Sequence, residues 1–377
     1  MASEAKAMEG DSQARQGGSA TAVAACGYWQ RRGMHTRPGQ VAAAPSAQLL
    51  LLAVLAAAGE GSVLVPRPSA GWHAPQARLL GRPVHTVPVP VECGGVPDPV
   101  ALRETVRRAR AEGEEPRVVV LSVADDCTGT AVPPEMLHEV CEAAGDEGLL
   151  IVSDESWRDT SHAPHDTVVV SPAEMLHGGR ESDAVVVLVG LGEALLPQGP
   201  QAGIARFPDS GRGRGLAGTV RAVLSELRAQ LHAPADGVVA DALTEPEVTR
   251  TRRVTAARSY GALLGALHDV CTAAGALCRP PQAGRHVYAD LEPVRPRLEA
   301  HGIKDSAGLE AELVRRLGPY ATGGHRLGDE PQALRVQLSS RLLTDGDPAP
   351  APLASPDVRG ALDSLRSVLD GLTAPRE

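Results

Sequence analysis

Short apolar runs alternate with segments of helical periodicity through the first half of the chain. The runs are rich in β-branched residues and are bounded by charged or turn-forming residues, which is typical of buried strands. Strands are expected over residues 62–65, 117–123, 149–153, 184–189 and, with a weaker pattern, 202–206. Continuous apolar strands separated by helices predict an α/β fold, in which a mostly parallel sheet is covered on both faces.

The pattern changes after about residue 215. Helices are expected over residues 216–232, 246–277, 306–317 and 357–372, with strands at 286–288 and 333–338. This arrangement predicts a second, smaller α+β domain at the C-terminus. We expect a tail without regular structure at 1–20, a large domain at 21–230 and a small domain at 231–377, because the first residues are polar, rich in Gly and Ser, and without periodicity.

Charge and composition exclude several classes of protein. The formal net charge of −9 argues against nucleic acid or an anionic membrane as a partner. The longest apolar run, residues 49–58, is too short to span a bilayer. No secretory signal is visible at the start of this sequence, and its six cysteines are scattered, so we interpret them as reduced thiols of a cytoplasmic protein.

Two local motifs do not indicate a binding site. Residues 213–218 fit the G-x-G-x-x-G pattern, but no strand leads directly into them and no acid follows at the required distance, so we expect a flexible basic loop. His162 and His165 lie beside Asp159 and Asp166, but a proline separates the histidines and no cysteine joins them. We therefore expect an exposed loop there and no metal site.

Acidic residues follow three of the expected strands. Asp126, Asp154 and Glu193 lie at or just after the ends of the strands over 117–123, 149–153 and 184–189. Parallel strands end at the same edge of a sheet, so these carboxylates are expected to converge on one crevice. The alternative is that each acid only caps the helix that follows it.

Several segments resemble the class I and II aminotransferases, which are fold-type I pyridoxal-phosphate (PLP) enzymes. The similarity spans roughly residues 22–345, and its motifs lie at 65–82, 125–130, 153–158, 190–195, 203–208 and 334–336. The resemblance implies a fold-type I large domain with a smaller C-terminal domain. It also implies a small-molecule substrate, a homodimer and PLP as the cofactor.

The sequence departs from this family at the residues that would hold PLP. Glu193 stands where the family has the lysine that forms a Schiff base, and a carboxylate cannot condense with an aldehyde. Gln201 replaces the arginine that pairs with the phosphate, and Asp126 and Trp157 replace residues facing the ring hydroxyl. Lysine occurs only at positions 6 and 304. We therefore expect no PLP cofactor, although Asp154 and Arg335 match the family.

These residues favour a PLP-independent acid–base enzyme that cyclises, dehydrates or isomerises a small metabolite in a biosynthetic pathway. Asp126, Asp154 and Glu193 would raise one another's pKa, so that one acts as acid and another as base. The expected substrate-binding residues are Arg335, Trp157, His73, Trp72 and Gln201, with His73 also able to shuttle a proton. Two alternatives remain open: a non-catalytic relative that binds a ligand or an active homologue, and a PLP-dependent aminotransferase.

Overall fold

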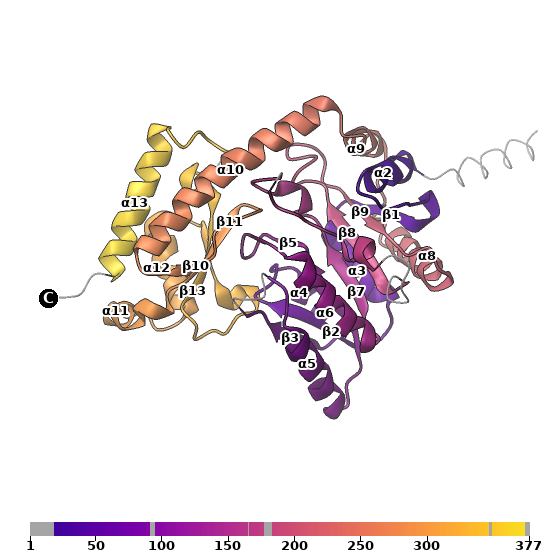
Figure 1. The fold of residues 1–377 in the computed structure, drawn as a ribbon, viewed down its shortest axis with the longest axis horizontal. Helices are drawn as coiled ribbons and strands as arrows, with labels where there is room; N and C mark the ends of the chain where they lie inside the picture. Colours follow the sequence, from indigo (N-terminus) through magenta and orange to yellow (C-terminus); the bar gives the residue numbers. More distant parts are fainter. Residues whose placement is uncertain (1–18, 91–94, 165, 177–182, 347–348, 374–377) are drawn as a thin grey trace, which may run out of the picture.

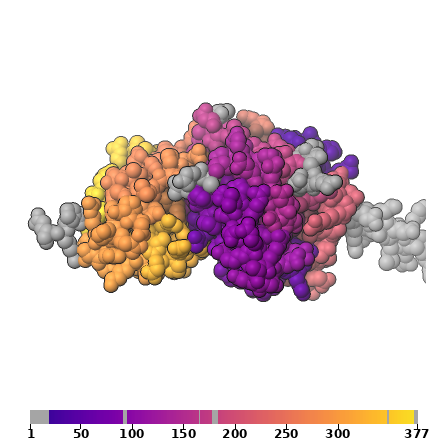
Figure 2. Space-filling view, turned by 60° about the horizontal axis from the view of Figure 1, so that its bottom comes forward, coloured from indigo at the N-terminus to yellow at the C-terminus, as the bar shows by residue number. Residues whose placement is uncertain are grey.

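Two lobes with separate cores lie side by side in the computed structural model (Figures 1 and 2). The structure describes residues 19–90, 95–164, 166–176, 183–346 and 349–373. Most of the expected N-terminal tail therefore lies outside the described residues. Its last two residues begin helix α2 (Ala20–Gln30), where the Ser19 side chain accepts a hydrogen bond from the Ala22 amide and caps the helix.

A seven-stranded mixed sheet forms the centre of the larger lobe. Its strands, in spatial order, are β1 (Val41–Ala44), β9 (Gly203–Arg206), β8 (Val185–Gly190), β7 (Leu150–Asp154), β4 (Pro116–Ser122), β2 (Ser62–Arg67) and β3 (Val84–Pro88). The pairs from β8 to β3 are all parallel, and β9 is antiparallel to both of its neighbours. The predicted mostly parallel sheet is thus confirmed.

Alternating strand residues bury the two faces of this sheet. In β4, Val118 and Val120 face one core, while Val119 and Leu121 face the other. Helices α3 (Ala47–Ala57), α4 (His73–Leu79) and α8 (Gly211–Glu226) cover the first face. Helices α2, α5 (Pro99–Ala111), α6 (Pro134–Asp146) and α9 (Ala235–Leu243) cover the second.

The expected basic loop at residues 213–218 is wrong, because these residues lie inside helix α8. Ser210 caps the helix by accepting a hydrogen bond from the Gly213 amide. A Cβ atom at Gly213 would lie 2.3 Å from the Pro208 carbonyl oxygen, so glycine allows the helix to start this close to the preceding turn. Gly213 thus serves packing at the helix start, whereas a Cβ atom at Gly215 or Gly218 would meet nothing within 4 Å.

The smaller lobe is an antiparallel sheet backed by helices. Its strand order is β10 (Leu277–Cys278), β11 (His286–Asp290), β13 (Arg335–Ser339) and β12 (Ala321–Gly323). Its helices are α10 (Glu247–Ala273), α11 (Arg295–Ala300), α12 (Ser306–Leu317) and α13 (Pro356–Thr373). Long helix α10 runs from beside α9 to the far lobe in Figure 1. No helix among the described residues is both long and apolar enough to cross a bilayer.

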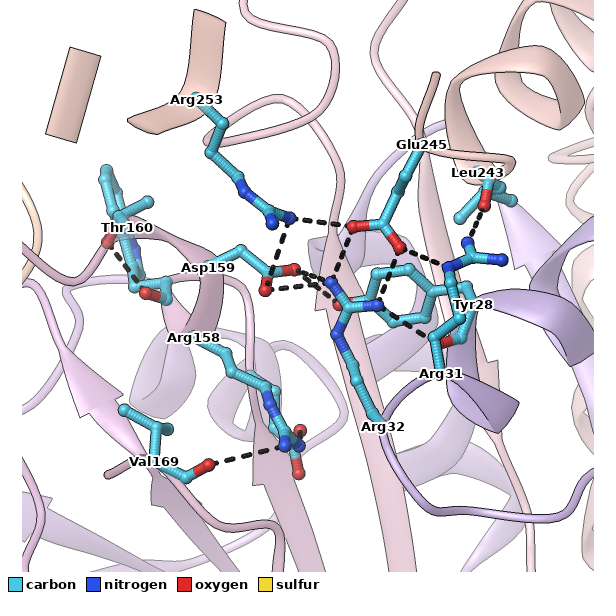
Figure 3. A network of polar contacts seen from close by, with 12 residues as sticks. Tyr28, Arg31, Arg32, Arg158, Asp159, Thr160, Val169, Leu243, Glu245 and Arg253 are labelled. Atoms are coloured by element: carbon cyan, nitrogen blue, oxygen red, sulfur yellow. Dashed lines mark hydrogen bonds and ion pairs between the residues drawn. The ribbon is translucent and has the colours of Figure 1, made fainter. Parts of the chain in front are cut away.

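A network of arginines and acids fastens the start of α10 to the larger lobe (Figure 3). Glu245 accepts hydrogen bonds from Arg31, Arg32 and Arg253, and its side chain is only 5% exposed. Asp159 binds the same Arg32 through both carboxylate oxygens and also accepts from the Tyr28 hydroxyl. The surrounding arginines lower the pKa of Glu245 to about 2, although burial opposes them.

We expect Glu245→Gln to lower the free energy of unfolding by about 3 kcal/mol, because it removes one of the two carboxylates that neutralise the buried Arg32 and Arg253. Because the folded-state pKa is depressed, the stabilisation by Glu245 is present above its ordinary pKa and is lost as the pH falls from about 4.5 to about 2. Urea unfolding across this range measures both effects. The control is Glu247→Gln, which changes an exposed ion pair with Arg250. Equal acid sensitivity in Glu245→Gln and the native chain would contradict this assignment.

Candidate active site

A polar crevice of about 290 Å³ opens where the parallel strands end and the smaller lobe meets the larger one. Residues at or after the ends of β4, β7 and β8 line it, together with the N-terminus of α3 and side chains from β11 and β13. Four acids face it, namely Asp125, Asp126, Asp154 and Glu193. The prediction that carboxylates converge at this edge is therefore confirmed.

Asp154 is a buried carboxylate that is held in its ionised form. Its Oδ2 atom lies 3.0 Å from His73 Nε2, and its Oδ1 atom accepts hydrogen bonds from the Ser156 hydroxyl and amide. Burial alone would raise its pKa, but the donors from His73 and Ser156 lower it. Our expectation that the three acids raise one another's pKa is therefore wrong for Asp154, which supplies a fixed negative charge.

His73 supports the crevice from behind and does not line it. The ring is fully buried, and its Nδ1 atom has no hydrogen-bond partner among the described residues. A neutral ring that donates from Nε2 to Asp154 leaves Nδ1 as an acceptor without a donor. Trp72 contacts this ring edge-on at 4.4 Å between centroids and itself reaches the crevice.

Asp126 joins the two lobes at the crevice. Its Oδ2 atom lies 2.7 Å from His286 Nδ1, and its Oδ1 atom accepts a hydrogen bond from the Arg285 amide. Donation from Nδ1 to a carboxylate fixes the tautomer and leaves the His286 Nε2 lone pair available as a proton acceptor. Gly284 precedes this pair at a φ of +75°, and a Cβ there would lie 2.4 Å from the Asp126 carboxylate.

The surroundings of Glu193 raise its pKa. Burial is the main cause, and the charges of Asp126 and Asp154 add to it. The Arg285 guanidinium opposes this shift from 3.7 Å, and the His286 ring also opposes it when it is protonated. Glu193 therefore holds its proton to higher pH than an ordinary glutamate.

Of the other site residues predicted from the sequence, two line the crevice and one lies outside it. Trp157 and Gln201 line it, as expected for substrate contacts. Arg335 lies outside it, where its guanidinium binds Asp290 and Asp329 at 2.9 Å from each. The side chain that β13 presents to the crevice is Gln337, two residues further along the strand.

Sequence reasoning did not assign three residues to the site. Arg285 directly precedes β11 and His286 begins it, and Gln337 shares with Arg335 one face of β13. The signal for the first two was a Gly-Arg-His sequence leading into a strand, although nothing local shows that this strand faces Asp126. Asp125 belongs to the quoted 125–130 motif, and burial raises its pKa to about 6.

Metal and thiol chemistry find no support among the residues described. No group of three or more His, Cys, Asp or Glu side chains there has the geometry of a metal site. Cys127 lines the crevice but is buried, which raises the pKa of its thiol well above the ordinary value. A thiol in this state is not a nucleophile at neutral pH.

Comparison with known proteins identifies the same framework. Residues 29–342 match the family model "Aminotransferase class I and II". An engineered aspartate aminotransferase from Thermus thermophilus is 20% identical, covers 93% of this chain and 85% of its own, and has a TM-score of 0.75. For N-succinyldiaminopimelate aminotransferase from Mycobacterium tuberculosis, the corresponding values are 20%, 93%, 84% and 0.74. No match is found among curated protein sequences.

The pKa of Glu193 gives a direct test of this electrostatic arrangement. Arg285→Gln removes a positive charge and should raise that pKa further, whereas Asp126→Asn removes a negative charge and should lower it. The measurement is a pH titration of carboxyl ¹³C shifts in glutamate-labelled protein, with Glu193→Gln identifying the resonance. Shifts in the same direction for both variants would contradict the arrangement.

Proposed function

The chain belongs to the aminotransferase class I and II family, and we propose that it uses this fold for acid–base catalysis on a small metabolite without PLP. One observation carries the proposal: the crevice holds a carboxyl group with a raised pKa, Glu193, together with a histidine oriented by Asp126. A carboxyl group with a raised pKa beside an oriented histidine is typical of acid–base sites.

The residues of the crevice do not fit PLP. A Schiff base needs a primary amine, and no lysine lines the crevice among the described residues. Lys304 is exposed between α11 and α12, and Lys6 lies outside the described residues. The amides at the N-terminus of α3 are available to an anion, but a phosphate here would meet four acids and no guanidinium group from the described lining residues.

Each polar group has a role in moving a proton across a bound substrate. Protonated Glu193 donates a proton to the oxygen of a carbonyl or leaving hydroxyl group, while His286 Nε2 accepts one from a neighbouring atom. Asp154 stays ionised and stabilises positive charge that develops on the substrate. Proton donation at one atom and removal at another supports isomerisation, dehydration or cyclisation. After one turnover Glu193 is ionised and His286 is protonated, so the transfer of one proton from His286 to Glu193 restores both groups.

For the size of the substrate and the place of the reaction in the cell, we keep the expectations drawn from the sequence. The substrate is a compact metabolite, because about 290 Å³ is at the lower end of the volumes of small-molecule sites. We propose that the protein acts in biosynthesis in the cytoplasm, as a homodimer, and this last point is supported by the family resemblance alone.

Turnover without added cofactor tests the acid–base proposal. Purified protein is incubated with a library of small metabolites, and products of unchanged or dehydrated mass are followed by liquid chromatography and mass spectrometry. Glu193→Gln and His286→Gln should each lower the rate by a factor of about 100 or more, because each removes one proton-transfer group. Glu104→Gln, on the exposed face of α5, is the matched control. Full activity in folded Glu193→Gln would overturn the proposal.

Transamination is the second candidate, and family membership is the observation that favours it. The test is an absorption spectrum with excess PLP, followed by borohydride reduction and mass determination. We expect no band near 420 nm and no covalently attached coenzyme after reduction, because the crevice offers no amine. A 420 nm band that reduction removes, with a gain in protein mass that is lost in Lys304→Ala or Lys6→Ala, would establish a Schiff base and replace the acid–base proposal.

A further inference from the structure

A second cavity of about 270 Å³ adjoins the acidic crevice, and Glu193 lines both. It lies between the strand-end loops of the larger lobe and the first half of α10. Its lining is mainly apolar, with alanines and prolines and the ring of Tyr260. Arg252, Arg253 and Arg285 also reach it, so its polar lining differs in sign from that of the crevice.

The arginines of this cavity carry more charge than its acids neutralise. Arg253 is paired with Glu245 and Asp159, but Arg252 makes no ion pair with any described residue and donates a hydrogen bond to the Leu195 carbonyl oxygen. Asp159 also lines the cavity, but it is already bound to Arg32. The remaining acid, Glu193, has a raised pKa and is uncharged once protonated. An anion is the ligand that this balance favours.

Arg285 is placed to receive that anion at the junction of the two cavities. Its side chain is 18% exposed, and it donates a hydrogen bond to the Glu193 carbonyl oxygen. Its guanidinium carbon lies 5.5 Å from the Trp157 ring centroid and 5.1 Å from that of Tyr260. The rings hold the planar group in position and limit its contact with water, which strengthens a charged hydrogen bond.

We propose that this second cavity binds an organic acid with an apolar body, and that Arg285 holds its carboxylate beside Glu193. The apolar body packs on the alanine and proline lining, and Arg252 adds a long-range attraction at the entrance. The group to be transformed then extends past Glu193 into the acidic crevice. The assignment names the substrate class of the proposed acid–base reaction and rests on that proposal for its biological meaning.

Glu193 links occupancy of this cavity to pH. When protonated, it leaves Arg285 free to bind the ligand carboxylate; when ionised, it competes for the same guanidinium group. Asp126 and Asp154 favour the protonated form, while Arg285 and His286 favour the ionised form. Affinity for a carboxylate should therefore fall as the pH rises through the ionisation of Glu193.

Binding of 3-phenylpropionate, compared with its uncharged amide 3-phenylpropanamide, tests the assignment. Isothermal titration calorimetry of the full chain at pH 6 should show the acid binding at least about tenfold more tightly than the amide. The reason is that only the acid forms a charged hydrogen bond with Arg285. Arg285→Gln should remove this preference, and Arg285→Lys should restore part of it. Arg250→Gln, an exposed arginine of α10 paired with Glu247, should bind as the native chain does.

If Arg285→Gln folds poorly, the pH dependence of binding tests the assignment in its place. As the pH rises through the ionisation of Glu193, the native chain should lose affinity for 3-phenylpropionate, whereas Glu193→Gln should bind it with little change, because its amide cannot ionise. Equal binding of acid and amide, or full binding by folded Arg285→Gln, would overturn the assignment. Binding is measured without turnover, so a ligand-binding cavity with no proton-transfer activity would refute the proposed function alone.

Discussion

The carboxylate of Asp126 is the constraint on which the site depends. It belongs to the larger lobe, yet its two oxygens bind Arg285, just before β11, and His286, the first residue of β11, in the smaller lobe. That one contact sets the His286 tautomer, places Arg285 beside Glu193 and requires glycine at position 284. Without it, the two lobes would still have separate cores, but the acidic crevice and the arginine-lined cavity would lose their common wall.

The surroundings of Asp154 lower its pKa and those of Glu193 raise it, although both are carboxylic acids. Asp154 and Glu193 are both withdrawn from solvent, which disfavours the charged form of each. Asp154 receives donors from His73 and Ser156 at hydrogen-bond distance, and they outweigh the cost of burial. Glu193 has the Arg285 guanidinium at 3.7 Å and His286 nearby, but it also lies near two other carboxylates, so burial dominates. One acid is therefore a fixed charge, and the other keeps its proton to higher pH.

The fold was predictable because its signals are local. The apolar runs at 117–123, 149–153 and 184–189 became β4, β7 and β8 within a residue or so, and Asp98 and Pro99 begin α5 as a cap and first residue. Prediction was wrong for residues 213–218, which lie inside α8. Gly213 lets this helix start close to the Pro208 carbonyl oxygen, and no local pattern records that contact.

The sequence by itself determined the class of fold, the edge of the sheet at which the acids gather, and the scarcity of amines, because periodicity, strand ends and composition are properties of the chain. Only the tertiary structure decided which side chains share that edge. Arg335 and Gln337 lie two residues apart on one face of β13, yet the first is bound by two aspartates and the second reaches the crevice. Contacts between the two lobes decide which side chains share the edge. Asp126 and Arg285 are brought together by this packing and not by their spacing in the chain.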